Sequence, residues 1–273
     1  MVKFISLLSL MSLAVGCASS VPDAFKPKEP ISAFSNADWN KVLRVAVTPD
    51  GYVRHDDVKA NKDGAYDALQ RYVGQIGEAS PKNRPDLFAT DADKLAYWLN
   101  AYNAICLYAV QKKNLPSNVL YSSIPPGLIF ISDSTRVGGE GMTLDNIERK
   151  YARSFNDPRI HFALNCMSTS CPPLRAEAFE GDRLEQQLSD QARLSLDEPR
   201  VVKKISDDEV AFNNIFTDYW KSDFVTYAKN KLGKADGTPL DACKSWAGPN
   251  SPVRTATKFS SQGYDWSLNR PRR

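Results

Sequence analysis

The sequence predicts a single mixed domain of the α/β (or α+β) class, in which a small sheet packs against a buried central helix and several surrounding helices. Its 42% hydrophobic and 10% aromatic residues are enough to build an extensive core. The segment 94–110 is apolar almost all round, which is typical of a buried helix. Short apolar runs between turn residues indicate only a few short strands.

The first residues indicate export. Lys3 gives a positive start, and the apolar run 4–15 has the length of a signal peptide and is too short for an ordinary membrane-spanning helix. Residues 13–17, Leu-Ala-Val-Gly-Cys, resemble the bacterial lipobox, in which the cysteine is acylated through its sulfur and becomes the new N-terminus. We expect residues 1–16 to be a signal peptide and Cys17 to carry lipid. An ordinary secretory signal with a chance cysteine is the alternative.

The residues after Cys17 indicate a location and a tether. Ala18 follows it where aspartate could stand, which in lipoproteins of Gram-negative bacteria implies the outer membrane, with the domain facing the periplasm. Several acyl chains would anchor the protein in that membrane. Residues 17–30 contain small residues and three prolines and are expected to be a lipidated tether, which leaves 31–273 as the globular domain. A net charge of +3 is too small to indicate a nucleic-acid partner.

The first elements of the domain follow from periodicity and turn residues. Residues 38–44 predict an amphipathic helix, and 45–54 predict a hairpin closed by a Pro-Asp-Gly turn. Residues 66–76 are apolar at helical spacing, with Gly77 as the expected stop. His55 lies among charged neighbours, so we expect it to be exposed to solvent.

The central helix, 94–110, carries two amides on one face. Asn100 and Asn103 are three residues apart, and a buried amide is costly unless it finds partners. They either hydrogen-bond neighbouring loop backbone or line a polar pocket. Cys106 continues the same face, and a thiol in an apolar helix is more often a small core residue.

A long connection follows the central helix. Residues 115–134 are rich in proline and serine, with a strand expected near 128–131, and 136–142 predict a strand or hairpin. Thr143 is a natural N-cap for the next helix. Glu148 falls on the inward side of that helix, where it could orient a histidine or cap another helix.

The segment 159–174 holds most of the reactive side chains, because the whole chain has only two histidines and five cysteines. Residues 160–165 have the composition of a strand, with His161 on one face, and Cys166 follows at its end. A loop of small hydroxyl residues comes next and leads to Cys171 and a helix. Backbone N–H groups in such a strand-loop-helix unit often gather around an anion or oxyanion.

Four blocks of this sequence resemble the DUF547 family, a family of unknown function. The blocks are 98–104 (Trp-Leu-Asn-Ala-Tyr-Asn-Ala), 143–148 (Thr-Leu-Asp-Asn-Ile-Glu), 159–174 (Arg-Ile-His-Phe-Ala-Leu-Asn-Cys-Met-Ser-Thr-Ser-Cys-Pro-Pro-Leu) and 264–269 (Tyr-Asp-Trp-Ser-Leu-Asn). The resemblance implies a single α/β domain, often exported or lipid-anchored in bacteria. The shared residues that it implies are those at Asn100, Asn103, Glu148, His161, Cys166 and Cys171. Arg149 departs from the family pattern, because many relatives carry histidine there.

The first interpretation of these residues is a thiol-dependent hydrolase or transferase acting on an amide or thioester. Cys166 is the expected nucleophile and His161 its general base, with Glu148 or Asn103 orienting the imidazole. The residues expected to line the substrate or oxyanion site are Asn100, Ser168, Ser170 and Cys171. No Gly-rich phosphate loop or nucleotide fingerprint is present in the sequence, so no cofactor is expected.

Two other interpretations stay open. His161, Cys166 and Cys171 could bind zinc, with Glu148 or water as the fourth ligand, although their spacing matches no common zinc module. In an oxidising periplasm the two cysteines could instead form a structural disulfide with each other, or either could pair with Cys243. The protein would then be a binding or scaffolding module of the envelope. Its ligand would be a small molecule or a peptide.

The remaining chain predicts structural support. Residues 201–211 alternate charged and apolar side chains around an Asp-Asp turn, and 212–224 predict a helix with its aromatic residues toward the core. Asp265 is expected to hydrogen-bond a loop rather than to reach a site.

Overall fold

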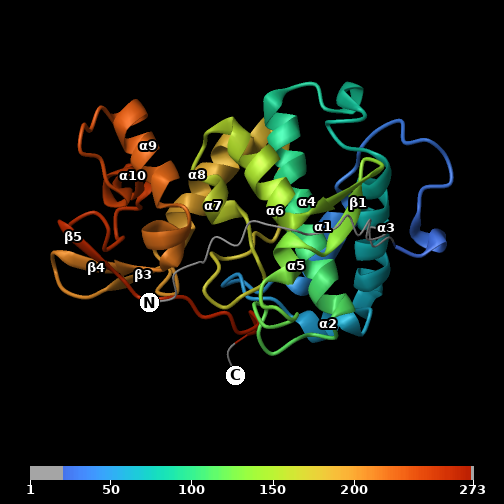
Figure 1. Cartoon of the computed structure of the whole chain (residues 1–273), viewed down its shortest axis with the longest axis horizontal. Helices are drawn as coiled ribbons and strands as arrows, with labels where there is room; N and C mark the ends of the chain where they lie inside the picture. The colour runs from blue at the N-terminus through green and yellow to red at the C-terminus, as the bar shows by residue number, and fades with distance from the viewer. Residues whose placement is uncertain (1–20, 272–273) are drawn as a thin grey trace.

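The computed structural model describes residues 21–271, and the predicted signal peptide and Cys17 lie outside the described residues. The predicted mixed class is confirmed, with helices predominating (Figure 1). The α-helices are α1 (Ala37–Ala46), α2 (His55–Lys59), α3 (Ala65–Glu78), α4 (Asp91–Lys112), α5 (Leu128–Ile131), α6 (Leu144–Asn146), α7 (Ile160–Ala163), α8 (Leu184–Ser195), α9 (Lys221–Leu232) and α10 (Pro239–Trp246). The strands are β1 (Ser134–Val137), β2 (Glu140–Thr143), β3 (Val202–Lys204), β4 (Glu209–Phe212) and β5 (Lys258–Ser261). Three further helical turns matter below: η1 (Asp23–Phe25), η4 (Ile147–Tyr151) and η7 (Ile215–Tyr219).

The core consists of two hydrophobic clusters. The larger one surrounds α4 and includes side chains of α1 and α3. The smaller one belongs to α9, α10 and the C-terminal sheet, which form the smaller lobe at the left of Figure 1. The short helix α7 contributes Ile160 to the first cluster and Phe162 to the second. Residues next to α7 therefore lie where the two clusters meet.

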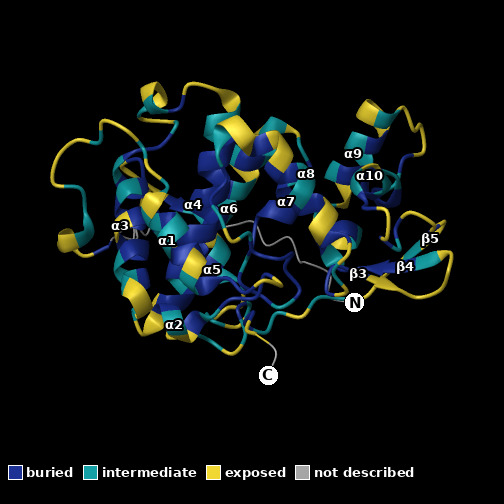
Figure 2. Cartoon of the chain, turned by 180° about the vertical axis from the view of Figure 1, so that it is seen from behind, coloured by how far each residue is buried: buried dark blue, intermediate teal, exposed yellow. Residues whose placement is uncertain are grey.

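The central helix α4 forms as predicted. Thr90 caps its N-terminus in a capping box, because its hydroxyl accepts from the Asp93 N–H at 3.0 Å while the Asp93 carboxylate accepts from the Thr90 N–H at 2.9 Å. Every residue from Leu95 to Tyr108 is buried, and Figure 2 shows the helix surrounded by other elements. Cys106 is fully buried in this stretch, as expected of a core residue.

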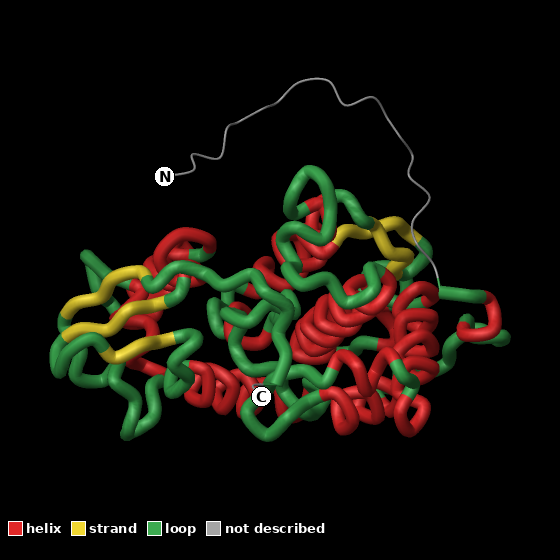
Figure 3. Tube along the Cα trace, turned by 90° about the horizontal axis from the view of Figure 1, so that it is seen from below, coloured by secondary structure: helices red, strands yellow, loops and turns green. Residues whose placement is uncertain are grey.

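The strands form two small separate sheets. β1 and β2 make the hairpin expected at 136–142, in antiparallel register with Ser134 opposite Thr143. In the second sheet β4 pairs antiparallel with β3 and parallel with β5. Figure 3 shows the two sheets at different places along the molecule. The prediction of one sheet packed on the central helix is therefore wrong in this detail.

Two expected strands are helices. Residues 128–131 form α5, and 160–163 form α7. Both are apolar runs of about four residues, and periodicity does not distinguish a strand from a single helical turn at that length. The expected hairpin at 45–54 is reduced to one antiparallel bridge between Val47 and Val53, because α1 extends to Ala46. Similarly, the helix expected at 212–224 is divided into β4, η7 and the start of α9.

Two single residues also differ from expectation. Gly77 does not stop α3, which continues to Glu78. His55 was expected to be exposed, but it is fully buried at the start of α2. Of the charged residues next to it in sequence, Asp56 is exposed and Asp57 is partly exposed, so the polar surroundings in the sequence did not indicate the burial of His55.

The chain is folded from the first described residues onward. Val21 is only 3% exposed, and a Cβ at Gly74 of α3 would lie 2.3 Å from the Phe25 carbonyl oxygen of η1. This close packing places residues 21–25 against the domain, where the sequence predicted a tether up to residue 30. From residue 21 to residue 271, no helix is long and apolar enough to cross a membrane.

Candidate thiol site

Two cysteine sulfurs touch in the loop that follows α7. The Sγ atoms of Cys166 and Cys171 are 2.6 Å apart, and both cysteines are free. Cys166 is half-buried, whereas Cys171 is 1% exposed. Between them Met167 has a φ of +63°, a left-handed conformation that costs energy for a side chain with a Cβ. This sharp turn brings the two sulfurs together.

Asn165 fixes the two ends of this loop. Its side-chain nitrogen donates to the Pro172 carbonyl at 2.7 Å, and its side-chain oxygen accepts from the Met167 N–H at 2.8 Å. Since the side chain is buried, these bonds are shielded from water and hold the loop closed.

Several hydrogen-bond donors surround the sulfurs. The Cys166 N–H donates to Cys171 Sγ at 3.0 Å, and the Tyr264 hydroxyl lies 3.3 Å from both sulfurs. The Ser168 hydroxyl is 2.9 Å from Cys166 Sγ and 3.4 Å from Cys171 Sγ. The two rings nearest Tyr264 are Trp266, at 4.6 Å between centroids, and Tyr219, at 5.7 Å.

These donors separate the two thiols in acidity. Burial opposes a charge on Cys171, but hydrogen bonds from Cys166, Ser168 and Tyr264 lower the pKa of Cys171 to about 6. Burial and the neighbouring Cys171 raise the pKa of Cys166 well above its usual value. The pair therefore holds one proton near neutral pH, and the charge lies on Cys171. The sequence had favoured Cys166 as the ionised nucleophile.

A segment distant in sequence supports the cysteine loop. The Thr169 N–H donates to the Ser267 carbonyl at 2.8 Å, and the Asn269 N–H donates to the Met167 carbonyl at 2.9 Å. The Ser170 hydroxyl accepts from the Asp265 N–H at 2.8 Å. Ser170 was expected to bind substrate, but here it anchors the loop, and Asp265 bonds a loop as predicted.

The two asparagines of α4 also bond backbone. Asn100 donates to the Phe179 carbonyl at 2.8 Å and accepts from the Phe179 N–H at 2.9 Å. Asn103 donates to the Ala163 carbonyl at 2.9 Å and accepts from the Asn165 N–H at 2.8 Å. Each amide thus donates one hydrogen bond to backbone and accepts one from it, which corresponds to the structural alternative. Asn103 positions the start of the cysteine loop and does not orient the imidazole.

His161 lies between two carboxylates. Its Nε2 is 2.9 Å from Asp223 Oδ2, and its Nδ1 is 3.8 Å from Glu148 Oε1. Trp220 stacks on the ring at 5.0 Å between centroids. Because both ring nitrogens face carboxylates, no hydrogen bond within the described part of the chain joins His161 to a sulfur. The expected Cys166–His161 dyad is therefore not formed, and the strand geometry on which it rested is replaced by α7.

The two carboxylates have opposite properties. Burial raises the pKa of Glu148 to about 8, and negative charge on Asp145 and Cys171 adds to the rise. Although burial also works against a charge on Asp223, hydrogen bonds from Arg153 and His161 lower its pKa. Burial lowers the pKa of His161 despite Asp223. Glu148 can therefore gain or lose a proton near neutral pH, and its pKa depends on the negative charge of Cys171.

Asp223 was not predicted as a site residue from the sequence. It lies in the first turn of α9, 62 residues after His161, and nothing distinguishes it there from an ordinary helix-start aspartate. Glu148 was correctly predicted to point inward, and it lies near the histidine as one alternative proposed. Cys243, expected on a surface loop, is buried in α10.

The arrangement divides the predicted site into two groups. Cys166, Ser168 and Cys171 form one, and Glu148 and His161 form the other. Across residues 21–271, no group of three or more His, Cys, Asp or Glu side chains is arranged to hold a metal ion. His161 is therefore not placed as a zinc ligand together with the two sulfurs.

The model of one protein family, described as "Protein of unknown function, DUF547", matches residues 88–194. These residues form a DUF547 segment. The DUF547 segment contains Asn100, Asn103, Glu148 and the whole cysteine loop, whereas Asp223 and the block at 264–269 lie beyond it. No curated protein and no solved structure matches the chain.

Proposed function

We propose that this protein is a thiol-dependent enzyme that acts by thiol–disulfide exchange at Cys166 and Cys171. The observation that supports the proposal is the contact of the two sulfurs at 2.6 Å, with Cys166 partly exposed and Cys171 buried among donors. Paired thiols of unequal exposure and acidity are suited to attack and resolution in disulfide exchange. The substrate class is a disulfide of a peptide or small molecule.

The exchange balances without a cofactor. Cys171, as thiolate, takes the proton of Cys166, and Cys166 Sγ attacks one sulfur of the substrate disulfide. The first substrate sulfur leaves as a thiolate. Cys171 then attacks Cys166 Sγ and gives its proton to the second substrate sulfur, which leaves as a thiol. The protein dithiol loses two electrons on forming its disulfide, and the substrate disulfide gains them.

A chromogenic aromatic disulfide that releases a coloured thiolate tests the proposal. The reduced wild-type protein should release two thiolates per Cys166–Cys171 pair and end as an internal disulfide, seen by mass spectrometry. The Cys171→Ser variant should release one thiolate and keep the mixed disulfide on Cys166. The Cys243→Ser variant, which changes a buried cysteine outside the site, should behave as wild type. A wild-type protein that keeps a stable mixed disulfide would contradict the proposal.

A second candidate is acyl transfer from a thioester or amide through a cysteine, as the sequence suggested. Glu148 favours it, because a carboxyl with a pKa of about 8 can exchange protons near neutral pH. Glu148→Gln should then abolish thioester turnover while leaving disulfide exchange in place. If neither the wild-type protein nor the Glu148→Gln variant turns over a model thioester, this candidate is excluded.

We further propose that the protein is a lipoprotein of the bacterial outer membrane, anchored through Cys17 with its domain in the periplasm. The lipobox-like residues 13–17 and the apolar run before them support this. Labelled palmitate should be incorporated into the wild-type chain and the Cys243→Ser control. It should not be incorporated into Cys17→Ser, which should also leave the outer-membrane fraction.

A further inference from the structure

A hollow outside the cysteine loop has the properties of a ligand site. It has a volume of about 360 Å³, enough for a small molecule, and is bounded by η4, the turn before α7, and α9. Neither sulfur lines it. Asp223 lies on its wall, so the hollow is on the carboxylate side of His161.

The hollow has three cationic side chains and two carboxylates in its wall. The cations are Arg149, Arg153 and Lys231, and the carboxylates are Asp157 and Asp223. Both carboxylates already accept from the protein: Asp157 from Arg159 at 2.7 Å, and Asp223 from Arg153 at 2.7 Å and His161 at 2.9 Å. Both carboxylates of the wall are therefore paired with cationic or ring N–H groups of the protein.

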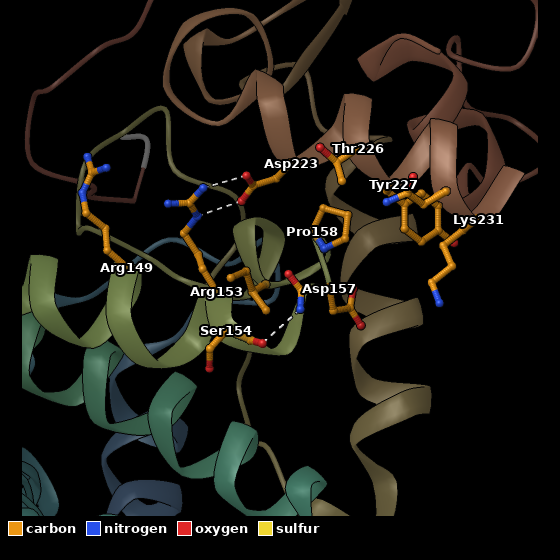
Figure 4. Close-up of a pocket in the computed structure, with 12 residues that line it drawn as sticks. Arg149, Arg153, Ser154, Asp157, Pro158, Asp223, Thr226, Tyr227 and Lys231 are labelled. Atoms are coloured by element: carbon orange, nitrogen blue, oxygen red, sulfur yellow. Dashed lines mark hydrogen bonds and ion pairs between the residues drawn. The ribbon is translucent and has the colours of Figure 1, made fainter. Parts of the chain in front are cut away.

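Its donors are not all occupied. Arg149 donates to Asp145 through Nε, and Arg153 donates to Asp223 through Nε and Nη2. Terminal guanidinium nitrogens of both arginines therefore remain for another acceptor. Lys231 makes no hydrogen bond or ion pair with the described residues. Figure 4 shows Arg153 directed at Asp223, with Arg149 on the same side of the hollow and Lys231 on the opposite side, beyond Pro158 and Tyr227.

Trp220 holds the two arginines in place. Their guanidinium carbons lie 4.7 Å (Arg149) and 4.4 Å (Arg153) from the centroid of its ring. Stacking limits the rotamers of both side chains before any ligand arrives, which lowers the entropic cost of binding. A guanidinium group fits the planar oxygen pairs of carboxylate and phosphate.

We infer that this hollow binds a small molecule through an anionic carboxylate or phosphate group. The group contacts the free guanidinium nitrogens of Arg149 and Arg153, at the end of the hollow where both lie against Trp220. The inference does not depend on the thiol chemistry, because it concerns binding at a wall that contains no sulfur.

Calorimetric titration of the full chain tests the inference. Inorganic phosphate and acetate are titrated separately at constant ionic strength, and saturable binding of either probe supports the site and identifies the group. The Arg149→Gln variant should weaken binding by about tenfold, since the substitution removes a charged hydrogen-bond donor. Lys231→Gln should bind as wild type does, because the Lys231 ammonium lies at the opposite end of the hollow (Figure 4).

Lys229→Gln is the matched control, because Lys229 is an exposed lysine of the same helix that does not line the hollow. It should bind both probes as wild type does. Binding of neither probe would overturn the inference. An equal loss of binding in Lys229→Gln and Arg149→Gln would overturn it as well, because it would indicate a general effect of surface charge.

Discussion

Removing the hydroxyl of Tyr264 is expected to raise the pKa of Cys171. The hydroxyl lies 3.3 Å from Cys171 Sγ, and it is one of the donors that lower the pKa of this thiol to about 6. A hydrogen bond to a charged group contributes about 1.5–3 kcal/mol, and the long distance places this one near 1.5 kcal/mol. Since one pKa unit corresponds to about 1.4 kcal/mol, Tyr264→Phe should move the pKa of Cys171 to about 7.

The assay is the ultraviolet absorbance of the thiolate in the reduced protein, followed as a function of pH. Phenylalanine keeps the ring against Trp266 and Tyr219, so the packing is retained. Tyr219→Phe is the control, because its ring packs on Tyr264 and its hydroxyl does not contact a sulfur at hydrogen-bond distance. Its titration should match that of the wild type. A midpoint unchanged in Tyr264→Phe would refute the assignment of Tyr264 as a donor to Cys171.

Three further substitutions test the buried polar groups. Glu148 has a pKa of about 8 in the folded protein, above its unfolded value, so wild-type stability should fall as pH rises from about 4 to 8. Glu148→Gln should flatten that fall and gain about 4–5 kcal/mol at the alkaline end in urea denaturation, and parallel curves would contradict the stated pKa. Asn103→Ala leaves the Ala163 carbonyl and the Asn165 N–H buried and unpaired, so it should lower the free energy of unfolding by about 3 kcal/mol in the same assay. Asn230→Ala, at an exposed position, should leave it unchanged. Thr90→Ala removes the cap of α4 and should cost about 1 kcal/mol in thermal unfolding, and an unchanged melting temperature would show that Asp93 alone suffices.

The sequence was most informative where a pattern is long. The buried helix α4 was predictable because its apolar character persists over many turns, and the β1–β2 hairpin was predictable from its glycines. The helix α7 was not, because four apolar residues fit a strand equally well, and this error placed His161 beside Cys166.

The candidate site was predictable in its residue types and less so in its contacts. The sequence singled out the two cysteines, whose sulfurs contact each other, and Glu148, which lies near His161. Asp223 and Tyr264 contact those groups from 62 and 98 residues away, and sequence spacing carries no signal over such separations. For Asn100 and Asn103, burial was predictable, but the choice between a pocket and loop backbone depended on elements that tertiary packing brings to α4.

The bonds between the cysteine loop and residues 264–269 have a consequence for the order of folding. Tyr264, Ser267 and Asn269 are synthesised almost a hundred residues after the loop that they support. Bringing these residues back to the cysteine loop lowers the entropy of the intervening chain, and this cost is met before the supporting hydrogen bonds form. A nascent or truncated chain that lacks these residues would expose two unrestrained thiols, open to wrong pairing until the last stretch docks.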